Sequence, residues 1–246
     1  MKYHYLPLLL LCMFAANAYT QEQEAPSRIH FGYCNGHLMV AVPANGLAKN
    51  VKKVGLGGGG NILIGIGDKL PFFAGVEVNS VNYDLESKRI SGASTGDPSK
   101  IRTGNNIFML HGMVRFAPYV NFFIQPYIDG MIGTKNFFTR TSIEYKNDEN
   151  SESYIEQGDW AFSYGGALGL RFRVFKEKGV TLDLRGAYLP GAIAKYMVRR
   201  KDNMDMYNEP IELFEEKQSE TSLTLIQIGV TANLWKPDKN RTESDH

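Results

Sequence analysis

The amino-acid sequence predicts an all-β protein, an eight-stranded antiparallel up-and-down transmembrane β-barrel. Three observations support this fold class. Apolar and polar residues alternate with a period of two along most predicted strands, short and long connections alternate along the chain, and the first residues have the pattern of an export signal. Helical periodicity is absent throughout.

The N-terminal residues predict a cleaved signal peptide. Lys2 precedes an apolar run over 6–15, and Ala16-Asn17-Ala18 then supplies an A-x-A processing site. The run is shorter than the roughly 20 apolar residues of a membrane-spanning helix, which disfavours an uncleaved anchor. The chain is therefore expected to contain a signal peptide (1–18), a short segment (19–27), the barrel (28–236) and a polar tail (237–246).

The composition limits the classes of partner and of covalent stabilisation. The chain has 27 Lys and Arg against 26 Asp and Glu, so its formal net charge of +1 gives no reason to expect nucleic acid as a partner. Cleavage would leave only Cys34, which excludes an intramolecular disulfide, and we interpret Cys34 as a small buried filler. The mean hydropathy of -0.27 looks like that of a soluble protein, but half of each barrel strand can also be polar.

The predicted strands are runs rich in Val, Ile, Phe, Tyr and Gly. We place them at 28–42, 53–67, 72–85, 104–116, 121–145, 154–175, 179–200 and 219–236. The connections are tight turns at 67–71, 117–120 and 176–179, and longer polar loops at 43–52, 86–103, 146–153 and 201–218. This alternation predicts short periplasmic turns, long extracellular loops and both termini in the periplasm.

The first predicted strand is the least regular of the eight. Ile29, Phe31 and Tyr33 alternate with their neighbours, but the alternation loses its phase near Gly36 and His37. We interpret this loss of phase as a β-bulge.

The other seven strands each contain one apolar column. In the second to fourth strands its members are Val54, Leu56, Ile62, Ile64, Ile66, Phe72, Ala74, Val76, Val78, Phe108, Leu110, Gly112, Val114 and Phe116. In the last four they are Phe122, Ile124, Pro126, Ile128, Gly130, Ile132, Phe162, Tyr164, Gly166, Leu168, Leu170, Phe172, Val174, Val180, Leu182, Leu184, Gly186, Tyr188, Thr224, Ile226, Ile228, Val230, Ala232 and Leu234. No charged residue falls in these columns, as expected for a surface where one Lys or Arg at mid-bilayer costs about 2 to 4 kcal/mol.

A soluble sandwich or lipocalin-like barrel is the alternative to the membrane barrel. It would turn the same apolar columns inward and the charged residues outward, and periodicity alone does not distinguish the two. The export signal, the asymmetry of the connections and the aromatic residues near strand ends favour the membrane barrel.

The charged residues of the opposite columns form the candidate functional site. We expect the lumen to contain Glu77, His111, Arg115, Asp129, Arg171, Arg173, Asp183 and Arg185. An eight-stranded barrel has an interior just wide enough for side chains to fill, which predicts a plug of paired charges. A narrow pore is the alternative, and its excess of Arg would favour anions.

Two further patterns in the sequence resemble sites of chemistry. The run Gly55-Leu56-Gly57-Gly58-Gly59-Gly60 satisfies GxGxxG, but a nucleotide site needs a helix to begin there, and the following residues continue a strand. His111 and Glu77 lie on adjacent predicted strands but lack a nucleophile or a third ligand. The sequence therefore predicts no enzyme, no metal site and no cofactor.

Three segments resemble a known family of membrane proteins. Their sequences are FIQPYIDGMIG over 123–133, YGGALGL over 164–170 and NLW over 233–235. In glycine and aromatic spacing they resemble the small OmpA-like or porin-family barrels common in Bacteroidetes. The resemblance implies a barrel in the cell outer membrane of a Gram-negative bacterium, and little chemistry. No peptidoglycan-binding domain follows here, and the tail replaces the usual terminal aromatic, so the assembly signal would be read at Trp235.

We expect a monomeric outer-membrane protein with a structural or surface-interaction role. Its partners would be outer-membrane lipid and lipopolysaccharide, together with any extracellular partner that binds the loops over 86–103 and 201–218. No histidine is followed by serine, unlike the His-Ser pair of the lipid A deacylases, which are also small outer-membrane barrels. The alternative functions are a narrow porin for small solutes and a soluble periplasmic ligand-binding barrel.

Overall fold

The computed structural model describes residues 30–66, 70–89, 98–118, 122–145, 151–175, 180–200 and 210–235. The predicted signal peptide (1–18), the segment over 19–27 and the tail (237–246) lie outside the described residues. Within the described part of the chain, no helix is long and apolar enough to cross a membrane.

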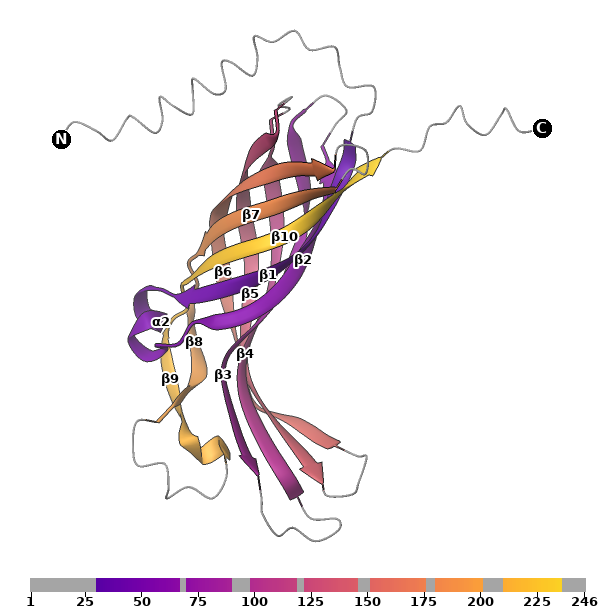
Figure 1. Cartoon of the computed structure of the whole chain (residues 1–246). Coiled ribbons are helices and arrows are strands. Elements are labelled where there is room, and N and C mark those ends of the chain that lie inside the picture. Colours follow the sequence, from indigo (N-terminus) through magenta and orange to yellow (C-terminus); the bar gives the residue numbers. More distant parts are fainter. Residues whose placement is uncertain are drawn as a thin grey trace, which may run out of the picture.

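Eight strands form a closed antiparallel barrel, which confirms the predicted fold class (Figure 1). Strand β1 closes the ring by pairing with both β2 and β10. In ring order the strands are β1 (His30–Pro43), β10 (Leu223–Trp235), β7 (Val180–Leu189), β6 (Ser151–Phe175), β5 (Ile124–Tyr145), β4 (Pro98–Phe116), β3 (Phe72–Arg89) and β2 (Gly55–Gly65).

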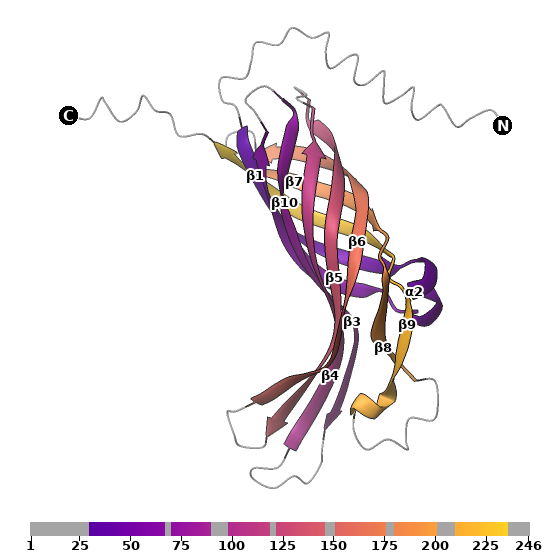
Figure 2. The same cartoon turned by 180° about the vertical axis from the view of Figure 1, so that it is seen from behind.

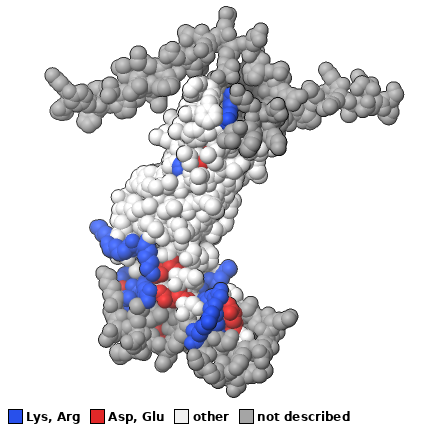
Figure 3. Space-filling model, in the orientation of Figure 1, with Lys and Arg blue, Asp and Glu red and all other residues white. Residues whose placement is uncertain are grey.

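The barrel is polar inside and apolar outside. In β10, Gln227 and Thr231 are buried, whereas Ile226, Ile228 and Val230 are more than half exposed, at 60%, 51% and 53%. The described members of the other predicted apolar columns are likewise exposed or partly exposed. Figure 3 shows few charged side chains over the barrel strands and many at the end near β8 and β9. This burial is the reverse of what the soluble alternative requires.

Strand β1 differs from the sequence-based expectation in two ways. Its pairing with β10 is continuous from Gly32 to Pro43, so there is no bulge at Gly36 and His37. The phase was hard to recognise because Gly36 occupies an outward position, while Tyr33 and His37 both point inward and are buried. Cys34 is exposed in the same outward column, so its interpretation as a buried filler was wrong.

The predicted strand over 179–200 is two strands. β7 ends at Leu189, Pro190 and Gly191 follow, and β8 (Ile193–Arg199) pairs with β9 (Phe214–Glu220) in a separate two-stranded sheet. Proline lacks the N–H that a ladder needs, which ends the barrel strand at this point. The predicted loop over 201–218 therefore contains β9 and a short 3-10 helix, Pro210–Leu213, while the last barrel strand begins at Leu223 instead of 219.

One end of the barrel is covered by a cap, which we define as α2 (Asn45–Asn50), the β8–β9 hairpin and the 3-10 helix (Figure 1). The predicted loop over 43–52 thus contains a helix. Leu47 of α2 and Tyr196 of β8 are buried against the inner face of the barrel strands, where the rings of Tyr196 and Phe137 lie 5.6 Å apart. Tyr83 donates a hydrogen bond to the carbonyl of Met197, 3.0 Å away. The cap is therefore an apolar layer across this end of the lumen.

Strands β3 to β6 continue beyond the barrel as a curved sheet beside the cap (Figure 2). They have 18, 19, 22 and 25 residues, whereas β7 has 10. About 9 to 11 residues suffice to span a bilayer. The predicted loop over 86–103 is accordingly strand up to Arg89 and again from Pro98. The described chain ends, His30 and Trp235, pair with each other at the opposite end, with the short connections.

A buried lysine joins the cap to the barrel wall. Lys135 of β5 is fully buried, and its Nζ donates to the carbonyl oxygens of Leu189 and Thr221, each 2.7 Å away. These two residues are the points at which the chain leaves β7 for the hairpin and returns toward β10. The ammonium group therefore fixes both ends of the hairpin to one place on the wall.

Replacing Lys135 with Met is expected to loosen the cap without opening the barrel. Two buried carbonyl groups lose their donor, which costs about 1 to 3 kcal/mol. We expect faster cleavage within the hairpin in limited proteolysis of the folded protein. Lys217→Met, which removes a half-exposed cation from the hairpin itself, is the matched control. Equal cleavage rates in wild type and Lys135→Met would contradict the role of this contact.

Candidate functional site

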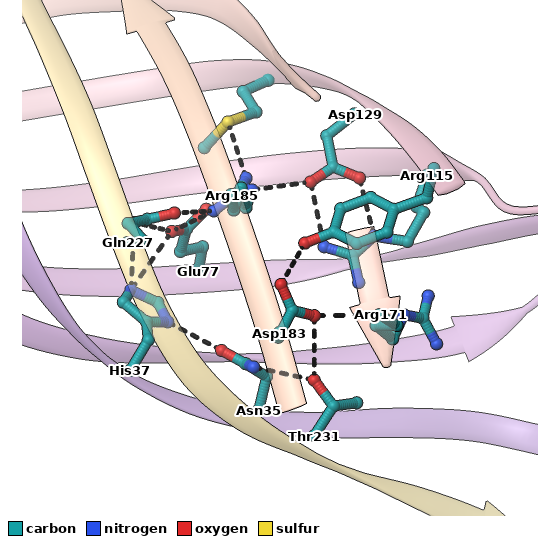
Figure 4. A network of polar contacts seen from close by, with 12 residues as sticks. Asn35, His37, Glu77, Arg115, Asp129, Arg171, Asp183, Arg185, Gln227 and Thr231 are labelled. Atoms are coloured by element: carbon teal, nitrogen blue, oxygen red, sulfur yellow. Dashed lines mark hydrogen bonds and ion pairs between the residues drawn. The ribbon is translucent and has the colours of Figure 1, made fainter. Parts of the chain in front are cut away.

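Arg185 lies at the centre of a buried charge network in the lumen (Figure 4). Its Nη1 donates to Glu77 Oε1 at 2.7 Å and to Gln227 Oε1 at 2.8 Å. Its Nε lies 2.9 Å from Asp129 Oδ2. Arg185 comes from β7, whereas Glu77, Asp129 and Gln227 come from β3, β5 and β10. One guanidinium group thus connects distant walls of the barrel.

Arg115 forms the second strong ion pair of the network. Its Nε and Nη2 donate to the two carboxylate oxygens of Asp129 at 2.6 and 2.9 Å, which is the bidentate geometry that Arg favours. The guanidinium carbon lies 3.8 Å from the centre of the Tyr127 ring. Gly169 leaves room for that ring, since a Cβ at this position would lie 2.0 Å from Tyr127 Cζ. The glycine in the inward column of β6 therefore allows the aromatic residue on β5 to cover the arginine.

Asp183 is the third carboxylate of the network. It accepts hydrogen bonds from the Tyr127 hydroxyl at 2.5 Å and from the Thr231 hydroxyl at 3.0 Å. Arg171 Nε lies 3.9 Å from Asp183 Oδ2, too far for a hydrogen bond but close enough for an ion pair. The guanidinium group of Arg171 also lies over the ring of Tyr33, 3.9 Å from its centre. Among the described residues its three guanidinium nitrogens have no hydrogen-bond partner, so attraction to a carboxylate and to an aromatic ring compensates only part of the cost of its burial.

Uncharged polar residues extend the network across β1, and sequence reasoning missed them. His37 lies 2.7 Å from Asn35 through Nδ1 and 2.9 Å from Asn79 through Nε2, and Asn79 in turn donates to Glu77 at 2.9 Å. Gly229 leaves space beside His37, since a Cβ there would lie 2.6 Å from the histidine Cβ. The signal was the inward column of β1, which the mistaken bulge concealed.

Two predicted site residues, His111 and Arg173, make none of the contacts described above. His111 is fully buried directly opposite Glu77 in the pairing of β4 with β3, but its Nε2 lies 3.0 Å from the hydroxyl of Ser163, and that hydroxyl lies 3.2 Å from the Pro190 carbonyl. Arg173 is only partly buried and pairs with Thr181 near the end with the short connections. Alternation predicts that a side chain points inward, but neither which partner it contacts nor how far along the lumen it lies, so the sequence does not separate these two residues from the rest.

The network is balanced in charge. The three arginines Arg115, Arg171 and Arg185 are at most 5% exposed, and three carboxylates, those of Glu77, Asp129 and Asp183, are at most 4% exposed. Buried charges of this kind are tolerated when each has a partner, and removal of one partner is strongly destabilising. The excess of arginine inferred from the sequence disappears once Arg173 is set aside.

The chemistry that this arrangement supports is electrostatic and structural. Among the residues that the structure describes, no group of three or more His, Cys, Asp or Glu is placed to hold a metal ion. His111 and Ser163 do meet in space, although they are distant in sequence, but both are fully buried. The GxGxxG run over 55–60 lies within strand β2, so no helix begins there to bind a phosphate.

Comparison with known proteins gives structural similarities only. No protein-family model and no curated protein matches the chain. The crystal structure of Neisserial surface protein A aligns with a TM-score of 0.45 and 11% sequence identity, covering 82% of this chain and 97% of that one. A major outer membrane protein from Thermus thermophilus aligns with a TM-score of 0.39 and 10% identity, covering 82% of this chain and 99% of that one.

Proposed function

We propose that this chain is a closed β-barrel of the cell outer membrane of a Gram-negative bacterium, with a structural or surface-interaction role. The observation that carries the proposal is the charge-balanced network that joins strands around the lumen. The apolar outer columns support a lipid environment, and the alternation of short and long connections supports an orientation with the cap outside the cell. The cap and the extension of β3 to β6 are then the parts offered to extracellular partners.

A narrow porin is the second candidate function. It would need a continuous aqueous path, but such a path would meet two layers in the described residues. The first is the ion-paired network, and the second is the apolar cap around Leu47 and Tyr196. Equal numbers of positive and negative side chains in the network also weaken the expected preference for anions. These observations favour a plugged lumen over a pore.

The remaining parts of the proposal rest on the sequence. Glycine and aromatic spacing supports an OmpA-like or porin-family barrel of the Bacteroidetes type. We further propose a monomer in contact with lipid and lipopolysaccharide, as the apolar outer columns would require in an outer membrane. We propose no catalytic role. The complete burial of His111 and Ser163 supports this, because a catalytic pair needs a face open to its substrate.

Conductance in a planar lipid bilayer tests the plugged lumen. The purified, folded protein is expected to give no current steps above those of the bare bilayer, because the network and the cap both block the lumen. A general bacterial porin recorded in the same bilayer serves as the positive control. Reproducible current steps from the folded protein, with a fixed amplitude, would replace the plugged barrel with the narrow porin.

A further inference from the structure

The outer face of the extension carries a group of cations. We define the extension as residues 82–89, 98–106, 136–145 and 151–160, where β3 to β6 continue beyond the barrel. Its inner face includes the buried side chains of Thr103, Thr139 and Thr141. The alternate positions Arg102 and Arg140 are exposed and therefore lie on the outer face.

Strand pairing places four cations close together on this face. Arg140 of β5 pairs with Gly104, and the outward residue next along β4 is Arg102, which pairs with Ser142. Lys100 pairs with Glu144 on one side and with Arg89 of β3 on the other. The group consists of Arg89, Lys100, Arg102 and Arg140.

These cations lie just beyond two aromatic residues, Phe138 of β5 and Trp160 of β6, which we call the aromatic level. Trp160, which is 58% exposed, pairs with Asn136, and Arg140 comes four residues later on β5. At about 3.3 Å per residue this separation is about 13 Å. The side chain of Arg140 turns back toward that level, since its guanidinium carbon lies 5.6 Å from the centre of the Phe138 ring. Aromatic residues sit at the headgroup level of a bilayer. The guanidinium group of Arg140 is therefore expected at the side of the headgroup layer that faces away from the hydrocarbon core.

The local charges leave this group net positive. Among the described side chains, the outer face of the extension carries Glu144 and, beside the irregularity opposite Arg140, the exposed Glu156, against four cations. Asp84 and Glu86 belong to the inner face, where they form ion pairs with Lys53 and Arg199. Arg102 Nη2 lies 3.4 Å from Glu144 Oε1, and the two side chains are 45% and 43% exposed. An ion pair this exposed contributes little, so Arg102 can exchange its carboxylate for another anion at small cost.

We propose that Arg102 and Arg140, supported by Lys100 and Arg89, bind the phosphate groups of an outer-leaflet lipid, the chemistry found in the lipid A part of lipopolysaccharide. This inference rests on the proposed outer-membrane location. Arginine matches phosphate through paired N–H donors. The apolar columns of the same strands, with Phe108 and Leu110 just below, are placed to contact the acyl chains of that lipid. A lipid can contact the cations with its phosphate groups and the apolar columns with its acyl chains, whereas a soluble anion can contact only the cations.

Retention of bisphosphorylated lipid A by the full mature chain in zwitterionic detergent tests this site, measured by native mass spectrometry. The variant Arg102→Gln/Arg140→Gln is expected to bind lipid A about tenfold more weakly than wild type, because two charge-assisted contacts are lost. The matched control is Lys195→Gln/Lys217→Gln, which removes the same charge from half-exposed positions on the hairpin and should bind within about twofold of wild type. Dephosphorylated lipid A should bind wild type as weakly as bisphosphorylated lipid A binds the Arg variant.

Equal retention of lipid A by wild type and the Arg variant would overturn the site, and so would a loss of retention in the Lys control as large as that in the Arg variant. Displacement of lipid A by millimolar inorganic phosphate would also overturn it, because it would indicate a site for free anions. Heat-modifiable migration of every variant is checked first. A wild type that migrates as a folded barrel but retains no lipid A contradicts this inference alone. A wild type recovered from cells as a soluble protein contradicts the proposed function as well.

Discussion

Replacing Arg185 with Met is expected to lower the free energy of unfolding by about 3 to 5 kcal/mol, the cost of breaking a buried ion pair from one side. The guanidinium group of Arg185 contacts both Glu77 and Asp129, so its loss leaves two carboxylates in the lumen with fewer partners. Methionine retains much of the side-chain volume, which limits the contribution of a cavity. The measurement is the urea dependence of the heat-modifiable band in detergent micelles.

Two comparisons separate this effect from a general loss of charge. Lys195→Met removes a half-exposed cation that lies 3.1 Å from Glu216 and should cost less than about 1 kcal/mol. Glu77→Gln combined with Arg185→Met removes one of the stranded charges and should recover part of the lost stability. If Arg185→Met unfolds at the same urea concentration as wild type, the network does not stabilise the barrel.

The second large effect is expected on the outer surface. Replacing Ile228 with Lys should lower the free energy of unfolding in lipid vesicles by about 2 to 4 kcal/mol, the cost of a cation at mid-bilayer. Ile228 pairs with Leu38 on β1 and Leu184 on β7, and all three side chains are exposed, so no carboxylate of these pairs is present to compensate the charge. In a water-soluble barrel the same change would be close to neutral.

Ile155→Lys is the matched control for this substitution. Ile155 is 58% exposed, close to the 51% of Ile228, but it lies in the extension beyond the aromatic level. We expect Ile155→Lys to lower the unfolding free energy by less than about 1 kcal/mol, the size of the repulsion from Arg140, its partner on β5. Equal effects of the two lysines in vesicles would show that the barrel surface does not face lipid.

The fold was predictable where a strand repeats the alternation of outward apolar and inward polar residues several times. In β10, five successive outward positions from Ile226 to Leu234 carry no charge, and this regularity fixed the face of the strand. The hairpin was not predictable in the same way. Residues 193–199 continue the β-like composition of β7, so only Pro190 and Gly191 marked the break. The pairing of β8 with β9 depends on a partner 15 or more residues away, which local patterns do not specify.

The candidate site was also predictable only in part: its charged residues were predicted and its neutral ones were not. Charged residues stand out in an otherwise small or polar column, so six of the eight residues named from the sequence, all but His111 and Arg173, lie together in the network. The neutral members were missed because Asn, Gln and Thr are ordinary lumen residues in any barrel. Tyr33 and Tyr127 were missed as supports of arginine because a position in the inward column does not specify which neighbouring side chain an aromatic ring contacts.

The most direct test of the membrane barrel is fractionation of cells that produce the full chain, followed by electrophoresis of boiled and unboiled samples. The structure predicts recovery in the outer-membrane fraction and a change in migration on boiling, because the closed ring of strands resists detergent until it is heated. Recovery in the soluble periplasm, with the same migration before and after boiling, would contradict the assignment of the apolar columns to lipid.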